Sequence, residues 1–160
     1  MKYLAAIALG SNLSSQWGDP SANIGEAVLR LDEIGEVRAL SSLYETAPVG
    51  YTDQPNFTNA ALLLETELAP PELMRALLGI ERAMGRDRSA AVPQKGPRII
   101  DLDLLLVDSV VLDTPELTLP HPAMHQRRFV LEPLAEIAPE MRDPTSGTTV
   151  REMLDTLKRG

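Results

Sequence analysis

Residues 96–108, GPRIIDLDLLLVD, constrain the fold of this chain more than any other stretch. The run of branched apolar residues predicts a buried strand, but Asp101 and Asp103 interrupt it. A carboxylate among aliphatic side chains is costly unless a cation meets it. Residues i and i+2 of a strand point to the same face, so these two project together, roughly 6.6 Å apart along the chain. They can converge on one divalent cation or span a metal pair. The alternative is an edge strand with a solvated polar face.

Apolar periodicity and turn residues give the order of elements around this strand. Proline after a capping aspartate predicts a first helix that begins at residue 20 and that Gly35 ends. Paired prolines open a second helix over residues 70–84. Strands are expected at residues 3–9, 37–46, 57–67 and 99–108, with an extended piece at 110–112, a short helix within 118–141 and a terminal helix at 149–158.

This order favours an α+β fold, because helices lie between strands but do not follow each one. We expect a ferredoxin-like arrangement, in which an antiparallel sheet is covered by helices on one face, with C-terminal additions. The runner-up is a small doubly wound α/β fold. The 160 residues predict one domain over 1–160.

Composition excludes several classes of protein. A net charge of −8 argues against a broad nucleic-acid-binding surface. The chain has no cysteine, so it has no disulfide and no thiolate metal site. No apolar run approaches the length of a membrane span, and the apolar N-terminus is too short before its Ala-x-Ala triplet to be a signal peptide. We therefore expect a cytoplasmic protein, without nucleic-acid or membrane partners, that is a monomer or a weak homo-oligomer.

Basic residues gather just before the acid pair. Five of the fifteen basic residues are Arg82, Arg86, Arg88, Lys95 and Arg98. Guanidinium groups beside a metal held by carboxylates are what a polyphosphate requires. The plain alternative is a solvated basic loop. The loop contains glycine, proline and few large apolar groups, so it could also act as a mobile lid.

Three further positions depart from the surrounding pattern. Glu81 falls inside the apolar arc of the second helix, where it could snorkel at the edge or accept hydrogen bonds from a ligand or a loop arginine. Phe57 and Phe129 are the only phenylalanines, and Phe57 shares its strand face with Asn59. Core packing is the default, but a flat heteroaromatic ligand would use ring stacking and a side-chain amide.

Two histidines also lie close together in the sequence. His121 and His125 are one helical turn apart at most. A proline between them and the turn context disfavour a metal pair.

Several blocks together resemble the 6-hydroxymethyl-7,8-dihydropterin pyrophosphokinase family of folate biosynthesis. The resemblance runs nearly end to end and keeps the order of that family's motifs. Its blocks are ALGSNL (8–13), SSLYETAPVGYTDQPNFTNAAL (41–62), IERAMGRDR (80–88), GPRIIDLDLLL (96–106) and LPHPAMHQRRFVLEPLAEIAPE (119–140).

The resemblance implies transfer of the β,γ-diphosphate of ATP to the pterin hydroxymethyl group, with AMP as the second product. It implies two Mg²⁺ ions as cofactors, held by Asp101 and Asp103 and bridging the triphosphate. The residues implied in catalysis are Arg86, Arg98, Asp101 and Asp103. Those implied at ATP are Glu81, Arg88, Arg98, Leu104, Thr118, His121 and Arg127. Those implied at the pterin are Thr46, Ala47, Val49, Phe57, Asn59 and Phe129, with the two phenylalanines on either side of the ring.

Two other classes of function stay open at this point. A non-catalytic ferredoxin-like module that binds a small ligand would form no AMP. A different Mg²⁺-dependent nucleotide enzyme, such as a cyclase or a nucleotidyl transferase, would release inorganic pyrophosphate. The nucleotide product formed from MgATP and the reduced pterin separates the three.

Overall fold

The computed structural model describes residues 1–48, 53–85 and 97–159. The main sheet and the two long helices between its strands are formed by β1 (Tyr3–Ser11), α1 (Pro20–Asp32), β2 (Glu36–Leu40), β3 (Tyr44–Thr46), β4 (Phe57–Thr66), α2 (Pro70–Ala83) and β5 (Asp101–Val107). The C-terminal part consists of β6 (Leu112–Asp113), β7 (Thr118–Leu119), the 3-10 helix η1 (Met124–Gln126), α3 (Arg128–Ile137) and α4 (Val150–Arg159).

The main sheet has the strand order β2-β4-β1-β5, and β3 also pairs with β4. Every pairing in this sheet is antiparallel. β1 is therefore a central strand with β4 on one side and β5 on the other. The crossover through α1 connects β1 to β2, and the crossover through α2 connects β4 to β5. The expected antiparallel α+β sheet is confirmed, and a doubly wound parallel sheet is not what forms.

Residues 37–46, expected as one strand, form two strands instead. β2 ends at Leu40, and Ser41 follows with its hydroxyl accepting a hydrogen bond from the Ala61 backbone N–H at 2.9 Å. The backbone N–H of Ser41 donates to the Ala61 carbonyl at 2.9 Å. One residue thus makes two bonds to the same point of β4, and the ladder is interrupted before β3 resumes at Tyr44.

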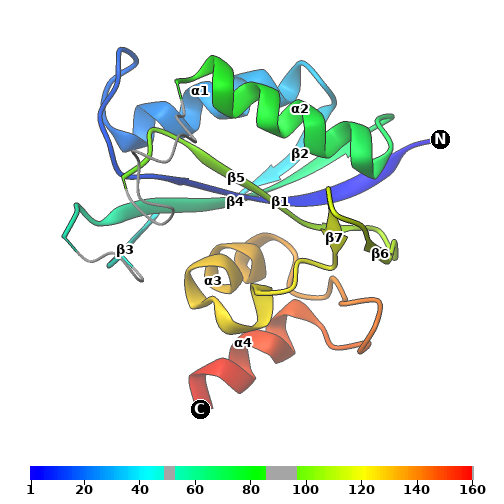
Figure 1. Ribbon diagram of the computed structural model, residues 1–160. Coiled ribbons are helices and arrows are strands. Elements are labelled where there is room, and N and C mark those ends of the chain that lie inside the picture. The colour runs from blue at the N-terminus through cyan, green and yellow to red at the C-terminus, as the bar shows by residue number, and fades with distance from the viewer. Residues whose placement is uncertain (49–52, 86–96, 160) are drawn as a thin grey trace.

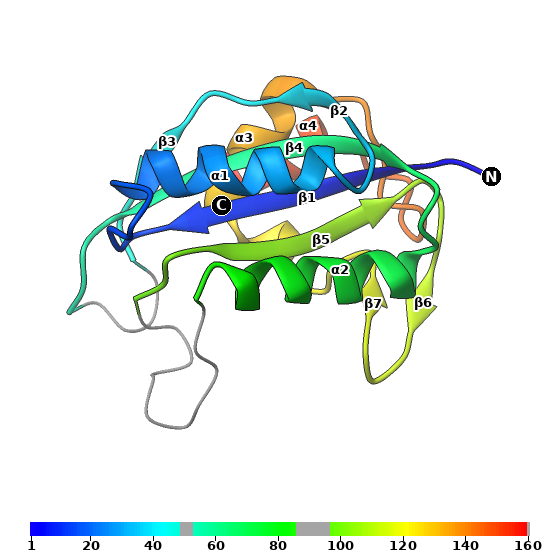
Figure 2. The same ribbon diagram turned by 90° about the horizontal axis from the view of Figure 1, so that it is seen from above.

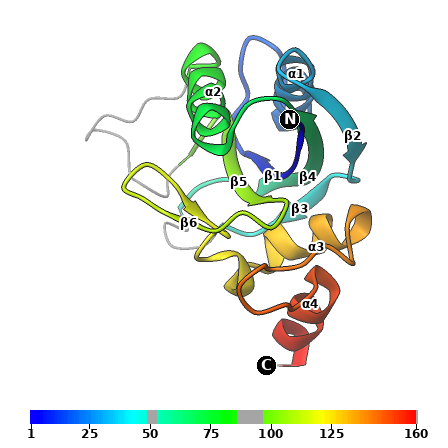
Figure 3. The same cartoon turned by 90° about the vertical axis from the view of Figure 1, so that its right-hand side faces the viewer.

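Helices cover both faces of the sheet, whereas the sequence predicted cover on one face (Figures 1 and 3). α1 and α2 lie side by side over one face (Figure 2), where Ile7 and Leu104 belong to the larger core cluster. α3 covers the other face, where Ala6 and Leu105 belong to a second cluster, and α4 packs on the far side of α3. Neighbouring residues of β1 and β5 are thus buried on opposite faces, which explains why the apolar run of β5 does not alternate with polar residues.

The helix termini follow the local signals in the sequence. The Asp19 side chain accepts a hydrogen bond from the Ala22 backbone N–H at 3.0 Å, and proline occupies the first turn of α1. Thr149 and Glu152 cap α4 reciprocally, each side chain accepting from the other's backbone N–H. Within residues 1–48, 53–85 and 97–159, no helix is long and apolar enough to span a bilayer.

Candidate active site

Asp101 and Asp103 lie at the start of β5, before the strand becomes fully buried. The Leu102 between them and the Leu104 that follows are buried in the cluster beneath α1 and α2. The two carboxylates therefore share the opposite face with Leu105, which packs toward α3. Their side chains are 25% and 29% exposed, so they are neither core residues nor fully solvated.

Each carboxylate has an arginine from a different segment. Arg98 Nη1 lies 3.1 Å from Asp101 Oδ2, and Arg127 Nη1 lies 3.7 Å from Asp103 Oδ2. Arg98 precedes β5, whereas Arg127 immediately precedes α3, so the C-terminal segment brings its own cation to the sheet edge. The sequence placed both arginines at the nucleotide, and the structure brings both beside the acid pair.

The surroundings of Asp103 disfavour its ionised form. Burial, and then the charge of Asp101, raise the pKa of the Asp103 carboxyl to about 7, although Arg127 opposes this rise. A divalent cation bound by both carboxylates would offset the repulsion between two like charges on one strand face. The donor set is oxygen only, as Mg²⁺ prefers.

The residues fit Mg²⁺ shared with a phosphate ligand better than a closed protein site. No cluster of three or more His, Cys, Asp or Glu side chains able to hold a metal occurs in the described part of the chain. Mg²⁺ commonly uses one or two carboxylates and completes its coordination with water and substrate phosphates.

Asn59 lies in the same row of the sheet as Asp101, with Gly10 between them. The registers pair Tyr44 with Asn59, Asn59 with Gly10, and Gly10 with Asp101. Paired residues of antiparallel strands direct their side chains to one face, so Asn59 and Asp101 flank a position that has no side chain. A Cβ on Gly10 would lie 3.2 Å from Asn59 Oδ1 and 3.8 Å from Phe57 Cδ1. Because Gly10 has no side chain, the space between the Asn59 and Asp101 side chains is left open.

Four of the residues expected at a flat heterocycle, Thr46, Ala47, Phe57 and Asn59, lie where β3 pairs with the start of β4. Asn59 Nδ2 donates to Thr46 Oγ1 at 2.6 Å, and Thr46 pairs with Phe57 across the two strands. Ala47 is exposed directly after β3. Phe129, at the start of α3, is partly buried against the second core cluster. The Arg127 guanidinium lies 5.8 Å from the centre of its ring, so one arginine touches both Asp103 and Phe129.

His121 lies near Asp101 and Arg127. We call Asp101, Asp103, Arg98, Arg127 and His121 the acid-pair cluster. Its backbone N–H donates to the Leu105 carbonyl at 2.9 Å, which fixes it beside β5. Its Nδ1 accepts a hydrogen bond from the Ala123 N–H at 3.1 Å, so Nε2 carries the proton of the neutral ring. Burial and the charge of Arg127 lower the pKa of His121, while Asp101 opposes this effect. The histidine is thus neutral near pH 7 and can offer an N–H donor to an anion.

The Glu81 side chain points into the protein interior, not toward the edge of the helix. Its side chain is buried, and Oε2 accepts a hydrogen bond from the Leu102 backbone N–H at 2.7 Å. Snorkelling at the edge, one alternative from the sequence, is wrong. The carboxylate joins α2 to the strand residue between the two aspartates, and its expected role at ATP stays a prediction.

The remaining expected site residues are less close to this cluster or are not described. The Leu104 side chain is buried in the core on the face opposite the acid pair, and Thr118 pairs with Asp113 in the β6–β7 ladder. Arg86, Arg88, Val49 and the proposed lid over 87–97 lie wholly or mainly outside the described residues.

Asn12 is a site residue that the sequence analysis did not single out. It is buried, and its Nδ2 donates to Gln54 Oε1 at 2.8 Å and to the Pro55 carbonyl at 3.0 Å. Its Oδ1 accepts from the Arg98 N–H at 2.8 Å. The only signal was the turn motif GSN after β1, which predicts a loop but not which loops the asparagine joins. Asn12 connects the segment before Phe57 with the segment that carries Arg98.

Comparison with known proteins places this geometry in a family. Residues 6–139 match the family described as 7,8-dihydro-6-hydroxymethylpterin-pyrophosphokinase. The chain belongs to this family. It is 42% identical over 155 residues to the Bacillus subtilis 2-amino-4-hydroxy-6-hydroxymethyldihydropteridine pyrophosphokinase, a match that covers 95% of this chain and 89% of that one.

Some relatives are longer, and this chain matches only one part of each. The chain is 39% identical over 156 residues to the Schizosaccharomyces pombe folic acid synthesis protein fol1, covering 96% of this chain but 20% of that protein. A crystal structure of Plasmodium falciparum HPPK-DHPS has a similar fold, with a TM-score of 0.73 at 17% identity. That match covers 98% of this chain and 43% of the other.

Proposed function

We propose that this chain transfers the diphosphate of ATP to 6-hydroxymethyl-7,8-dihydropterin in folate biosynthesis. The products are the pterin diphosphate and AMP. The observation that carries this proposal is the row of β5, β1 and β4 in which Gly10 separates Asp101 from Asn59. In this proposal the row holds a cation for the polyphosphate at Asp101 and the edge of a flat heterocycle at Asn59. The family membership supports the same reaction.

In this proposal the pterin ring lies between Phe57 and Phe129, and its polar edge meets Asn59 and Thr46. Stacking fixes the plane of the ring, and the amide selects the orientation of its edge. Because Asn59 is itself held by Thr46 at 2.6 Å, the pocket is organised before the ligand enters. Ala47 and Val49 would contribute backbone groups at the same edge.

The oxygen of the pterin hydroxymethyl group attacks the β-phosphorus of ATP. The new bond joins that oxygen to the β-phosphorus, the bond between the β-phosphorus and the α,β-bridging oxygen breaks, and AMP leaves with that oxygen. The hydroxyl proton passes to solvent. This chemistry needs positioning and charge neutralisation, and it needs no protein nucleophile.

Asp101 and Asp103 would hold Mg²⁺, which we take to be two ions, and the metal would supply charge neutralisation on the triphosphate. Arg98 and Arg127 now pair with these aspartates, so the bound nucleotide would offer them new partners. His121 would donate from Nε2 to a phosphate oxygen. By family resemblance, five further residues belong to the proposed ATP-binding and catalytic set: Arg86, Arg88, Glu81, Leu104 and Thr118.

The strand order and the two crossover helices support the ferredoxin-like description of the sheet and helices α1 and α2. The segments from β6 to α4 are then the C-terminal additions. We also infer one functional domain over residues 1–160, because the second core cluster joins α3 and α4 to the central strands of the sheet.

A product assay tests the proposed function. The chain is incubated with MgATP and the reduced pterin, and the nucleotide product is identified by chromatography. We expect AMP and pterin diphosphate, and a loss on the order of 100-fold or more in kcat for Asp101→Ala. Asp113→Asn, which changes an exposed acid of β6, serves as the control. Inorganic pyrophosphate as the product, or no AMP from the unmodified chain, would reject the proposal.

A further inference from the structure

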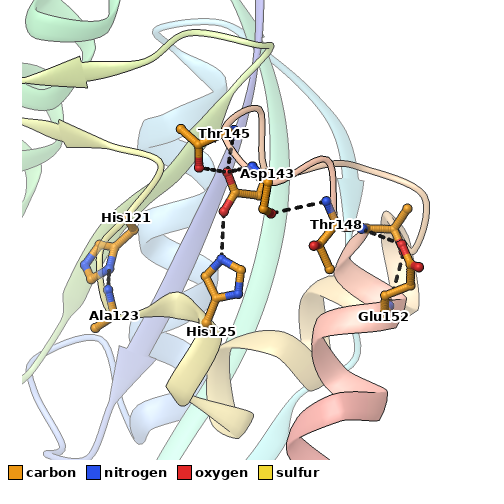
Figure 4. A network of polar contacts seen from close by, with 9 residues as sticks. His121, Ala123, His125, Asp143, Thr145, Thr148 and Glu152 are labelled. Carbon is orange, nitrogen blue, oxygen red and sulfur yellow. Dashed lines mark hydrogen bonds and ion pairs between the residues drawn. The ribbon is translucent and has the colours of Figure 1, made fainter.

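Asp143, in the segment between α3 and α4, is a buried acid with several hydrogen-bond partners (Figure 4). Its side chain is 5% exposed. Oδ1 accepts from the Thr145 backbone N–H at 2.8 Å and from the Thr145 hydroxyl at 2.6 Å. Oδ2 lies 2.7 Å from His125 Nε2. The residue lies outside the range 6–139 that matches the family.

The charge of Asp143 determines the direction of the bond to His125. Burial alone would raise the pKa of this carboxyl, but the hydrogen bonds from Thr145 and His125 and from the backbone hold it at about 2. An ionised carboxylate only accepts hydrogen bonds, so His125 Nε2 carries a proton and donates it to Oδ2. The contact is therefore a charge-assisted hydrogen bond with one defined tautomer at Nε2.

The segment that presents Asp143 is fixed at both ends. The Asp143 N–H donates to the Thr148 carbonyl at 2.9 Å, and the Gly147 N–H donates to the Asp143 carbonyl at 2.8 Å. Asp143 is thus held by its own turn independently of His125.

His125 lies in η1, between two residues of the acid-pair cluster. His121 precedes η1 and is fixed to the Leu105 carbonyl, whereas Arg127 follows η1 and reaches Asp103 at 3.7 Å. The path from His121 to Arg127 is short and contains η1: the Met124 N–H donates to the His121 carbonyl at 3.3 Å, and the Arg127 N–H donates to the Met124 carbonyl at 3.2 Å. A hydrogen bond at its middle restricts both ends.

We propose that Asp143 and His125 form a latch by which the C-terminal segment positions His121 and Arg127 for the phosphates of ATP. Asp143 and His125 are positioning residues in this proposal, because neither lies in the acid-pair cluster. The inference rests on the proposed function, and it assigns a role in nucleotide binding to a segment beyond the matched family range. Loss of the latch should weaken MgATP binding and leave pterin binding unchanged, since Phe57 and Asn59 are held by β3 and β4.

The test compares variants of the latch with a variant that destabilises the same region elsewhere. His125→Ala and Asp143→Asn should raise the Kd for a non-hydrolysable MgATP analogue about 10-fold, with the pterin Kd unchanged. His125→Gln keeps an N–H donor and should restore most of the affinity. Thr149→Ala removes the side-chain cap of α4, whose two hydrogen bonds involve no residue of η1, so it should lower the melting temperature and leave both Kd values unchanged. An unchanged analogue Kd in both latch variants, or an equal rise in Thr149→Ala, would overturn the proposal.

Amide exchange separates this inference from the proposed function. Exchange at residues 121–127 should accelerate in Asp143→Asn but not in Thr149→Ala, whether or not nucleotide is present. Absence of MgATP binding by the unmodified chain would reject the proposed function, and with it the role of the latch at ATP. Unchanged exchange at residues 121–127 in Asp143→Asn would reject the latch alone.

Discussion

At the scale of single residues, the acid pair shows which part of the proposed site is encoded locally and which part depends on distant segments. Asp101 and Asp103 are placed on one strand face by a spacing of two, and this was predictable from the sequence. The partner of Asp103 was less predictable, because Arg127 lies far along the chain and only the path through β7 and η1 brings it within 3.7 Å. Side-chain spacing gives local geometry, whereas tertiary contacts between distant segments are not encoded in any local pattern.

Without Mg²⁺, the stability contributed by Asp103 should fall as the pH rises from about 4 to about 7. The pKa of its carboxyl is about 7 in the folded chain, against an ordinary value of 3.8 when the chain is unfolded. Between these values the folded state binds more protons, so raising the pH favours unfolding. Asp103→Asn should remove this slope and raise the free energy of unfolding at pH 8 by about 1 kcal/mol. Urea denaturation in EDTA at pH 5 and pH 8 measures the free energy of unfolding, with Asp113→Asn as the control. A dependence of this free energy on pH that Asp103→Asn leaves unchanged would contradict the expectation.

Phe129→Ala should weaken pterin binding far more than ATP binding. Ring stacking contributes about 0.5–1.5 kcal/mol beyond simple burial, and the lost apolar area adds to this. Phe129→Leu keeps much of the apolar volume without the ring, so it should retain more of the stability while losing the stacking. Calorimetric titration with each ligand gives both affinities. An equal loss for both ligands together with a large drop in melting temperature would identify Phe129 as a core residue only.

At the scale of elements, periodicity predicted β1, α1, β4, α2 and β5 well but missed how they are joined. The break after β2 follows from Ser41, whose hydroxyl replaces a backbone partner on β4. The burial of Glu81 follows from its hydrogen bond to the Leu102 N–H, which faces α2. Both depend on hydrogen bonds between distant segments, and a polar residue in an apolar pattern does not reveal its partner.

Glu136 is another such contact, because it joins α3 to β3. It accepts hydrogen bonds from the Ser42 backbone N–H and hydroxyl, each at 3.0 Å to Oε2, and from the Tyr44 hydroxyl at 2.7 Å. The hydrogen bond to Glu136 raises the pKa of Tyr44 to about 12, so the phenol remains a donor. Since α3 carries Phe129 and β3 carries Thr46, this contact helps to set the distance between the two sides of the proposed pterin pocket.

Tyr44→Phe and Glu136→Gln should therefore each weaken pterin binding, by about 1 kcal/mol or roughly fivefold, with little change for ATP. The double variant should lose less than the sum of the single losses, because both remove one contact. Glu132→Gln, which changes an acid paired with Arg128 on the same helix, is the matched control. Strictly additive losses, or an equal effect of Glu132→Gln, would show that the contact does not position the pocket.

At the scale of the whole molecule, the net charge opposes binding of a polyanion, whereas the fold favours it locally. The net charge of −8 disfavours a polyanion anywhere on the surface. The fold offsets this locally by bringing Arg98, from before β5, and Arg127, from before α3, to one end of the sheet. Because both arginines are engaged by the aspartates, free ATP meets little unpaired positive charge among the described residues of this cluster. We therefore expect nucleotide binding to depend strongly on the metal.

This dependence should be visible in the thermal stability of the whole chain. At 100 times its Kd, a ligand that binds only the folded state adds about 2.7 kcal/mol, which corresponds to a rise of roughly 5–11 °C in melting temperature for a chain of this size. MgATP should produce such a rise, whereas equal ATP with EDTA should produce much less. Asp103→Asn should lose most of the MgATP effect, and Asp113→Asn should keep it. A rise that is the same with and without Mg²⁺ would mean that the arginines alone bind the nucleotide, and the carboxylates would then have no role in holding a metal.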